Sequence, residues 1–223
     1  MSVLAWHFVG ATLRDGRAVP PDGETLIHDG PLELCASGLH ASERIIDALQ
    51  YAPCSTVCRV QCDGEMQRGA DKLVCAQRTI LWRLDATDVL RSFARRCALD
   101  VAHLWKMPPV VRQYLETGDE TIRAAARSAA ARSAAARPAA ARAAARSAAR
   151  SAAWDAAASA AAWDAAWDAA SAAASAAASA AAWFAAWAED RLAAWAEDRH
   201  AAWDAAWDAQ NTLLTMMVKE ARL

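Results

Sequence analysis

The region from Thr121 to Gln210 is close to a polymer of alanine in which a larger residue recurs every four or five positions. It contains no glycine and few β-branched residues, and alanine has the highest helix propensity of all residues. We therefore predict a long α-helical region, with a kink or a break at Pro138 because proline lacks an amide hydrogen. A strict four-residue spacing, however, drifts around a helix of about 3.6 residues per turn. The alternatives are a tightly wrapped helical bundle, widened π-type turns or a solenoid of small residues.

The recurring residue of this region changes from cationic to aromatic near residue 150. The basic block consists of Arg123, Arg127, Arg132, Arg137, Arg142, Arg146 and Arg150. The tryptophan set consists of Trp163, Trp167, Trp183, Trp187, Trp195, Trp203 and Trp207. All acidic residues of the region follow the change, so its first half is basic and its second half is acidic.

Rows of tryptophan on an alanine surface are typical of an interface, because tryptophan buries a large area and alanine permits close approach. We expect the repeat to self-associate or to bind a protein partner, with attraction between its basic and acidic halves. The alternative is that the basic block binds nucleic acid, with an affinity that falls steeply as salt rises. The net charge of −2 argues against a protein whose whole surface binds nucleic acid.

The chain divides by composition into three segments. We predict an α+β globular domain at residues 1–118, an alanine-rich repeat at 119–210 that is basic to about 150, and an amphipathic terminal cap at 211–223. Alternating apolar residues predict a first strand from Leu4 to Phe8 that ends near Gly10. Further strands are predicted at Thr25–His28, Leu32–Ala36, Val57–Cys62 and Arg78–Leu84.

Capping residues and prolines predict the helices of the globular domain. One short helix is expected from a cap at Ser42 to Pro53, and a longer one from Thr87 to Trp105. A third helix is closed by Gly118, after which Asp119 or Thr121 starts the repeat.

Cysteine usage and hydropathy indicate a soluble protein of the cytoplasm. All six cysteines precede the repeat in apolar segments, where we expect reduced, largely buried thiols. Cys54, Cys58 and Cys62 do not predict a zinc site, because residues four apart on a strand are separated by roughly 13 Å. No apolar run reaches the roughly 18 residues that cross a bilayer, and Met1–Gly10 lacks the features of a signal peptide. We expect neither a metal nor membrane binding.

Several motifs of the first segment resemble an uncharacterised domain family of bacteriophages and prophages, whose members are often followed by low-complexity repeats. The resemblance rests on Ser-Gly-Leu-His-Ala-Ser at 37–42, on Asp-Ala-Leu at 47–49 and on Tyr-Ala-Pro at 51–53. It extends from Trp6 to about Gly118. The resemblance implies a phage accessory protein of unknown activity in an infected or lysogenic bacterial host.

The first segment is also similar to small ADP-ribosyltransferases, which carry a histidine in an early strand. That resemblance implies that His7 contacts a ribose of NAD, that Tyr51 is the aromatic residue of the site, and that NAD is the cofactor. The resemblance also implies an acid that stabilises the oxocarbenium charge, for which the candidates are Glu65 and Asp71. Neither lies in a recognisable motif.

His7, His40 and Tyr51 are therefore the candidate catalytic residues. A structural role is the competing interpretation of all three: His40 follows a turn and fits a local hydrogen bond, His7 fits a strand edge, and Tyr51 fits the core. No phosphate-binding glycine loop and no nucleophile elbow occurs in the sequence. We expect an accessory protein whose repeat is an oligomerisation or protein-interaction element. An NAD-dependent enzyme in the first segment is the alternative function.

Overall fold

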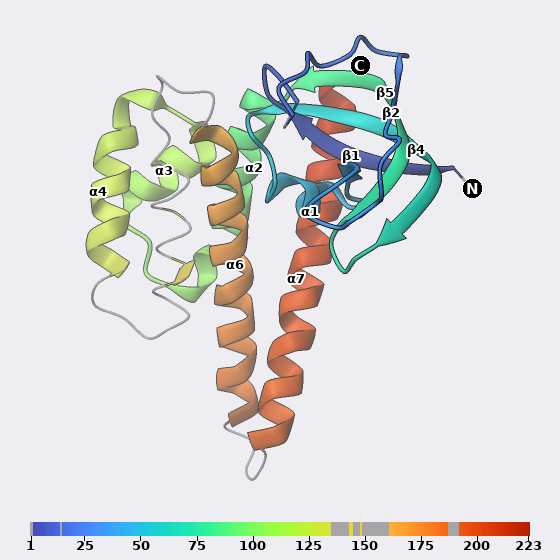
Figure 1. The fold of residues 1–223 in the computed structure, drawn as a ribbon. Coiled ribbons are helices and arrows are strands. Elements are labelled where there is room, and N and C mark those ends of the chain that lie inside the picture. Colours follow the sequence, from blue (N-terminus) through green and yellow to red (C-terminus); the bar gives the residue numbers. More distant parts are fainter. Residues whose placement is uncertain (1, 14, 135–142, 145–147, 149–160, 187–191) are drawn as a thin grey trace. The chain divides into compact units, whose positions relative to one another are not determined.

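The computed structural model describes the backbone of residues 2–13, 15–134, 143–144, 148, 161–186 and 192–223 (Figure 1). Side chains are described for the same residues apart from 134, 161–167, 181–186 and 192–198. The chain forms two compact units. The first contains Met1–Thr87 together with Leu214–Leu223, and the second contains Asp88–Leu213.

An antiparallel sheet of five strands forms the frame of the first unit (Figure 1). The strand order is β1-β4-β5-β2, and β3 also pairs with β5. The strands are β1 (Val3–Val9), β2 (Thr25–Ile27), β3 (Leu39–Ala41), β4 (Thr56–Arg68) and β5 (Leu73–Asp85). Because β4 occupies one edge of β5, the short strands β2 and β3 follow one another along its other edge.

Buried side chains lie on both faces of the sheet, because successive residues of a strand point to opposite faces. Ala5, Val60 and Ile80 belong to a buried cluster on one face, and Trp6 and Phe8 of β1 are buried on the other. Helix α1 (Ile45–Leu49) packs against β1 and is buried along its whole length.

The last residues of the chain belong to the first unit as a helical segment. Leu214 and Val218 are fully buried, and the Arg222 guanidinium lies 4.7 Å from the centre of the Trp82 ring. Trp82 in turn meets Trp6 edge to face, with ring centres 5.8 Å apart. The amphipathic stripe predicted for residues 211–223 thus contributes apolar side chains to the N-terminal unit.

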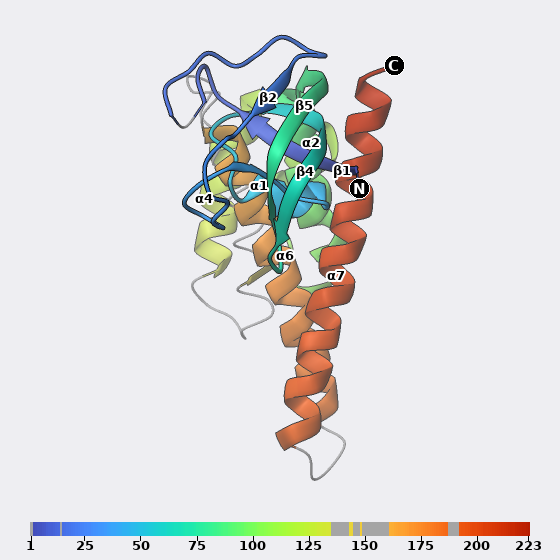
Figure 2. The ribbon, with the colours of Figure 1, turned by 45° about the vertical axis from the view of Figure 1, so that its right-hand side comes forward.

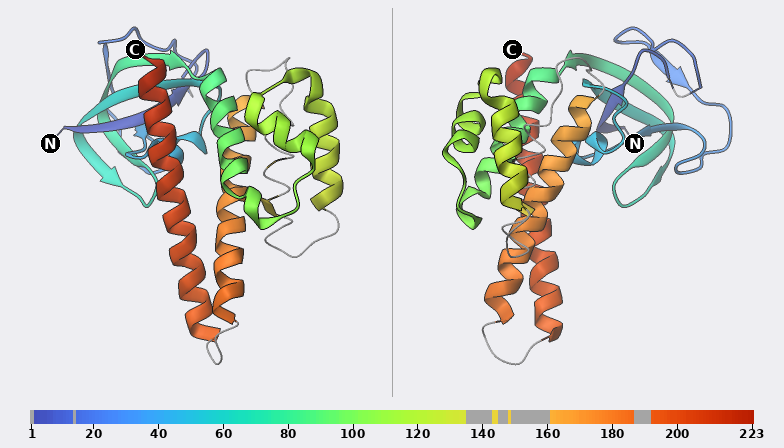
Figure 3. Two further views of the ribbon diagram at one scale, coloured as in Figure 1. Left: turned by 180° about the vertical axis from the view of Figure 1, so that it is seen from behind. Right: turned by 90° about the vertical axis from the view of Figure 1, so that its left-hand side faces the viewer.

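Helices make up the second unit, which contains α2 (Thr87–Asp100) from its second residue onward. It continues through the 3₁₀ turns Ala102–Leu104 and Glu120–Ile122, and through α3 (Pro109–Thr117), α4 (Arg123–Ala134), α6 (Ala161–Ala186) and most of α7 (Leu192–Ala221). α6 and α7 run antiparallel side by side (Figures 2 and 3). Gln210 of α7 donates a hydrogen bond of 3.1 Å from Nε2 to the Ala170 carbonyl of α6. The described part of the repeat is therefore α-helical, and Pro138 lies outside the described residues.

Most strands and helix ends of the N-terminal part lie where local sequence signals predict them. The strand from Leu4 and the strand from Thr25 are confirmed, and the two later strands are the centres of the longer β4–β5 hairpin. Gly118 closes α3 in the left-handed conformation at φ 69°, and the Asp119 carboxylate accepts the Thr121 amide at 2.9 Å, both as predicted.

Three local predictions are wrong. Leu32–Ala36 is not a strand: Glu33 and Ser37 form a bridge around a tight turn in which Cys35 has φ 71°. Ser42 does not cap α1, because its backbone pairs with Trp6 and the capping position is Arg44. Finally, α2 ends at Asp100 and gives way to a 3₁₀ turn before residue 105.

Candidate ligand-binding pocket

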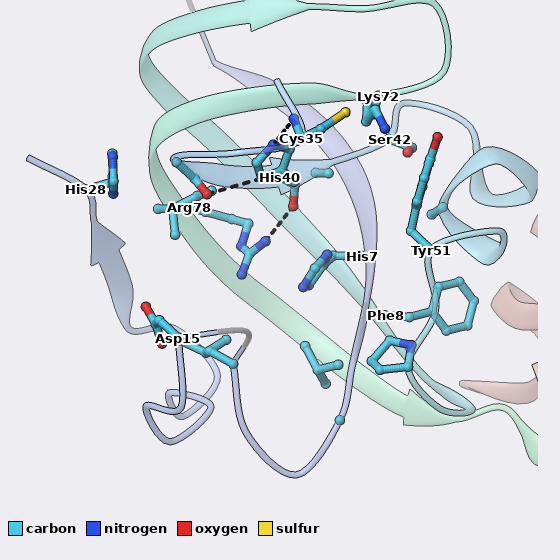
Figure 4. A pocket seen from close by; sticks show the side chains of 18 of the residues that line it. His7, Phe8, Asp15, His28, Cys35, His40, Ser42, Tyr51, Lys72 and Arg78 are labelled. Atoms are coloured by element: carbon cyan, nitrogen blue, oxygen red, sulfur yellow. Dashed lines mark hydrogen bonds between the residues drawn. The ribbon is translucent and has the colours of Figure 1, made fainter. Parts of the chain in front are cut away.

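A pocket of about 940 Å³ lies within the first unit (Figure 4). Its walls come from β1, from residues 10–13 and 15–17, from residues 35–42, from the region of α1 and from Arg78 of β5. Volumes of roughly 300–1,000 Å³ are typical of small-molecule sites. The pocket is thus large enough for a ligand of nucleotide size.

His7 reaches the pocket from the middle of β1, on the same strand face as the buried residues Ala5 and Val9. Burial lowers the pKa of its imidazole well below 6.5, and the charges of Arg78 and His40 lower it further. His7 is therefore neutral at pH 7. A neutral imidazole offers one hydrogen-bond donor and one acceptor to a ligand.

Both ring nitrogens of His40 are held by backbone groups of the pocket wall. Nε2 accepts a hydrogen bond of 2.9 Å from the Cys35 amide, which fixes the remaining ring proton on Nδ1. Nδ1 then donates to the Gly38 carbonyl at 3.2 Å. The ring therefore joins β3 to the preceding turn, and its hydrogen-bonding groups face the protein.

Tyr51 lies at the rim of the pocket, where contacts to its hydroxyl and its ring hold the side chain in place. Its hydroxyl donates to Asp71, which also accepts from the Gln50 amide at 2.7 Å. Lys72 lies over the ring, with Nζ 4.0 Å from its centre. Burial and the carboxylate of Asp71 raise the pKa of Tyr51, and hydrogen bonds to Tyr51 and Cys35 raise the pKa of Lys72. This rim combines an aromatic face with a cation.

Arg78 is the pocket residue that the sequence analysis did not find. It sits on β5 between Leu26 of β2 and Cys62 of β4, and only 3% of its surface is exposed. Nη1 donates to the carbonyl of His40, and Nε is buried without a hydrogen-bond partner among the described residues. One sequence signal existed, because Arg78 is two residues from the buried Ile80 and so shares its strand face. The sequence predicts Arg78 only as the first residue of a strand, and no role was assigned to it.

Other polar side chains of the pocket bind one another. The Asp15 carboxylate pairs with Arg17 at 2.7 Å. His28 Nε2 lies 3.0 Å from the Ser37 hydroxyl and 3.3 Å from the Pro31 carbonyl. These contacts hold the loops of the wall in place.

The structure thus brings His7, His40 and Tyr51 to one pocket, as lining residues. Neither candidate acid lines the pocket, but Asp71 is adjacent to it through its bond to Tyr51. In the portion of the chain that is described, no group of three or more histidine, cysteine or acidic residues is arranged to hold a metal ion.

The predicted interaction residues lie largely outside the described side chains. Of the tryptophan set, only Trp203 and Trp207 are described; both are half-buried, and their rings stack with centres 5.8 Å apart. Of the basic block, Arg123, Arg127 and Arg132 are described, and the last two are exposed. Within the described residues, none of the helices is both long and apolar enough to span a membrane.

The strands and the pocket coincide with a known but uncharacterised domain. Residues 3–92 match the family model described as "Domain of unknown function (DUF7666)". The match covers the whole sheet and the start of α2, and it ends before the limit at Gly118 that the motif resemblance suggests. No curated protein and no solved structure matches the chain. This match is consistent with the uncharacterised domain family expected from the sequence, and it attaches no activity to the domain.

Proposed function

We propose that the N-terminal unit is a small-molecule-binding domain and that its ligand occupies the pocket beside His7. The observation that supports this most directly is that candidate residues far apart in the sequence line the same pocket. Three side chains singled out in a sequence of 223 residues, His7, His40 and Tyr51, line one cavity of about 940 Å³. Sites of this kind combine apolar walls with a few fixed polar groups, as this pocket does.

Two exposed alanines, one of which lines the pocket, provide a direct test, because a large side chain in the pocket wall blocks a ligand without removing any polar group. Ala36 lines the pocket and is exposed, whereas Ala70 is exposed in the β4–β5 turn and does not line it. Ala36→Trp and Ala70→Trp form a matched pair. Saturation-transfer NMR on the full chain with NAD, adenosine and nicotinamide measures binding. We expect binding by the wild type and Ala70→Trp, and weaker binding by Ala36→Trp. Equal binding by both variants, or no binding at all, rejects the proposal.

An NAD-dependent ADP-ribosyltransferase-like activity is the second candidate function of this domain. The shared location of His7 and Tyr51 favours it, since the family resemblance assigns both residues to an NAD site. Asp71 is placed beside the tyrosine and is the better positioned of the two candidate acids. Release of nicotinamide from NAD by the full chain, lost in His7→Ala, is the expected result. Absence of release in the wild type removes this candidate.

The helical repeat is proposed as an oligomerisation or protein-interaction element. The half-buried Trp203–Trp207 stack is the described feature that supports this role. Nucleic-acid binding is the alternative, supported by the exposed side chains of Arg127 and Arg132. A role as a phage accessory protein in the host cytoplasm is likewise a proposal, and it rests on the motif resemblance.

A further inference from the structure

The guanidinium of Arg78 is buried in the first unit without a carboxylate beside it. Strands β2 and β4 flank the residue, and its side chain lines the pocket. A buried charge is strongly unfavourable unless it is paired, and buried arginines therefore have anionic partners. Among the described residues no carboxylate pairs with Arg78, and its one hydrogen bond goes to the backbone carbonyl of His40.

The charged and titratable groups around the guanidinium do not replace such a partner. Three thiols, those of Cys58, Cys62 and Cys75, interact electrostatically with it and could become anions. Burial raises the pKa of Cys58 to about 12, and a hydrogen bond to Cys75 raises that of Cys62. Both therefore remain protonated at pH 7.

Cys75 is the competing internal counter-ion. Its thiol lies 3.2 Å from the Leu39 carbonyl, to which it donates, and this bond requires the proton. The hydrogen bond from Cys62 nevertheless lowers the pKa of Cys75, so a thiolate there is the alternative source of negative charge. The experiment below includes a variant that separates the two.

The pocket itself is cationic around Arg78. Figure 4 shows the guanidinium and the ring of His7 pointing into the same space. Lys72 adds a cation at the rim, and among the described lining residues the one acid, Asp15, is already paired with Arg17. A neutral His7 beside the arginine leaves the guanidinium as the strongest donor in the interior.

We propose that Arg78 is the anion-binding residue of the pocket and that the ligand carries a phosphate or carboxylate group which pairs with its guanidinium. The inference rests on the proposed ligand-binding function and adds the chemical class of the ligand. Guanidinium presents parallel N–H groups that match either oxyanion. The volume of about 940 Å³ leaves room for an organic body beyond the oxyanion, next to the apolar and aromatic side chains of the walls.

The test uses the full chain at constant ionic strength, with phenyl phosphate, benzoate and inorganic phosphate as anionic probes and adenosine as a neutral probe. Calorimetry measures affinity, and thermal unfolding measures the stabilisation that binding produces. Arg78→Met removes the charge and nearly keeps the length. Arg83→Met is the matched control on the same strand, since Arg83 pairs with Asp22 at 2.6 Å and lies outside the pocket.

We expect Arg78→Met to weaken binding of phenyl phosphate by roughly tenfold to a hundredfold, the loss typical of a charged hydrogen bond. Arg83→Met is expected to bind like the wild type. The ligand-free Arg78→Met protein should unfold at the same temperature as the wild type or higher, because an uncompensated buried charge has been removed. Should that variant fail to fold, Arg78→Lys provides the same test, because it keeps the charge but loses the paired donors.

Two results overturn the proposal while leaving the ligand-binding function intact. One is tight binding of adenosine without binding of any anionic probe. The other is unchanged anion binding in Arg78→Met or Arg78→Lys. Cys75→Ala tests the alternative that the Cys75 thiolate pairs with Arg78. Anion binding that appears only after this substitution identifies the thiolate as the resident counter-ion and rejects a ligand anion. Phosphate binding without benzoate binding assigns the oxyanion to a phosphate ester, and the reverse assigns it to a carboxylate.

Discussion

At the scale of single residues, His7 and His40 both line the pocket but differ in their hydrogen bonding. His40 has both ring nitrogens bound to backbone groups, whereas His7 keeps a neutral ring beside Arg78. The first arrangement stabilises a turn, and the second leaves polar atoms for a ligand. Histidine identity alone did not distinguish these roles in the sequence.

We predict that His40→Ala destabilises the protein by about 1–3 kcal/mol, the range for leaving buried hydrogen-bonding groups without a partner. The Cys35 amide and the Gly38 carbonyl both lose their partner in this variant. Urea unfolding measures the effect, and the exposed His103→Ala is the control. Unchanged stability together with lost ligand binding assigns His40 to the binding machinery instead.

His7 makes stability depend on pH. Its folded pKa lies below the unfolded value of 6.5, so the unfolded chain binds the proton more readily. The contribution is fully present above pH 6.5 and is lost as pH falls toward the folded pKa, by up to about 1.4 kcal/mol per pH unit. We predict a smaller loss between pH 7 and pH 5 in His7→Gln than in the wild type. Parallel stability curves of the two proteins contradict a depressed pKa.

At the scale of elements, the turn before β3 shapes the pocket wall. Gly38 has φ 109°, and a side chain there meets Val74 and Leu32. Gly16 has φ 85° but open space around it. We predict that Gly16→Ala costs about 1 kcal/mol from backbone strain, and Gly38→Ala roughly 2–4 kcal/mol because a clash is added. Thermal unfolding of the two variants compares them, and equal losses contradict close packing at Gly38.

Local chemistry explains which elements could be predicted from the sequence. The left-handed Gly118, the Asp119 cap and the alternation in β1 each depend on a few adjacent residues. Leu32–Ala36 was misread because apolar composition suggests a strand, whereas the turn at Cys35 is held by His40 five residues later. The burial of Arg78 was missed for a similar reason. It depends on β2 and β3 covering one edge of β5, and the residues next to Arg78 in the sequence do not reveal pairing across more than thirty residues.

At the scale of the whole molecule, the chain joins a domain of ordinary composition to helices built mainly from alanine. The last ten residues return to the first unit, where Leu214 and Val218 are buried. The repeat is thus enclosed in sequence between two parts of one folded unit. Its helices present few large side chains, so tryptophans dominate any association that they make.

We predict that the repeat self-associates and that the double substitution Trp203→Ala/Trp207→Ala weakens the assembly. The stacked, half-buried rings supply apolar area that alanine cannot replace. High salt should weaken the assembly less, since screening leaves apolar burial intact. Sedimentation velocity over a range of concentrations measures this. A wild-type chain that is monomeric throughout contradicts the interaction role.

A crystal structure of the full chain grown with phenyl phosphate tests whether the pocket of the N-terminal unit holds an anionic ligand. We expect a phosphate group within hydrogen-bond distance of the Arg78 guanidinium and a phenyl ring against the apolar wall of the pocket. A pocket that contains only water, with the probe absent or bound elsewhere on the surface, contradicts it.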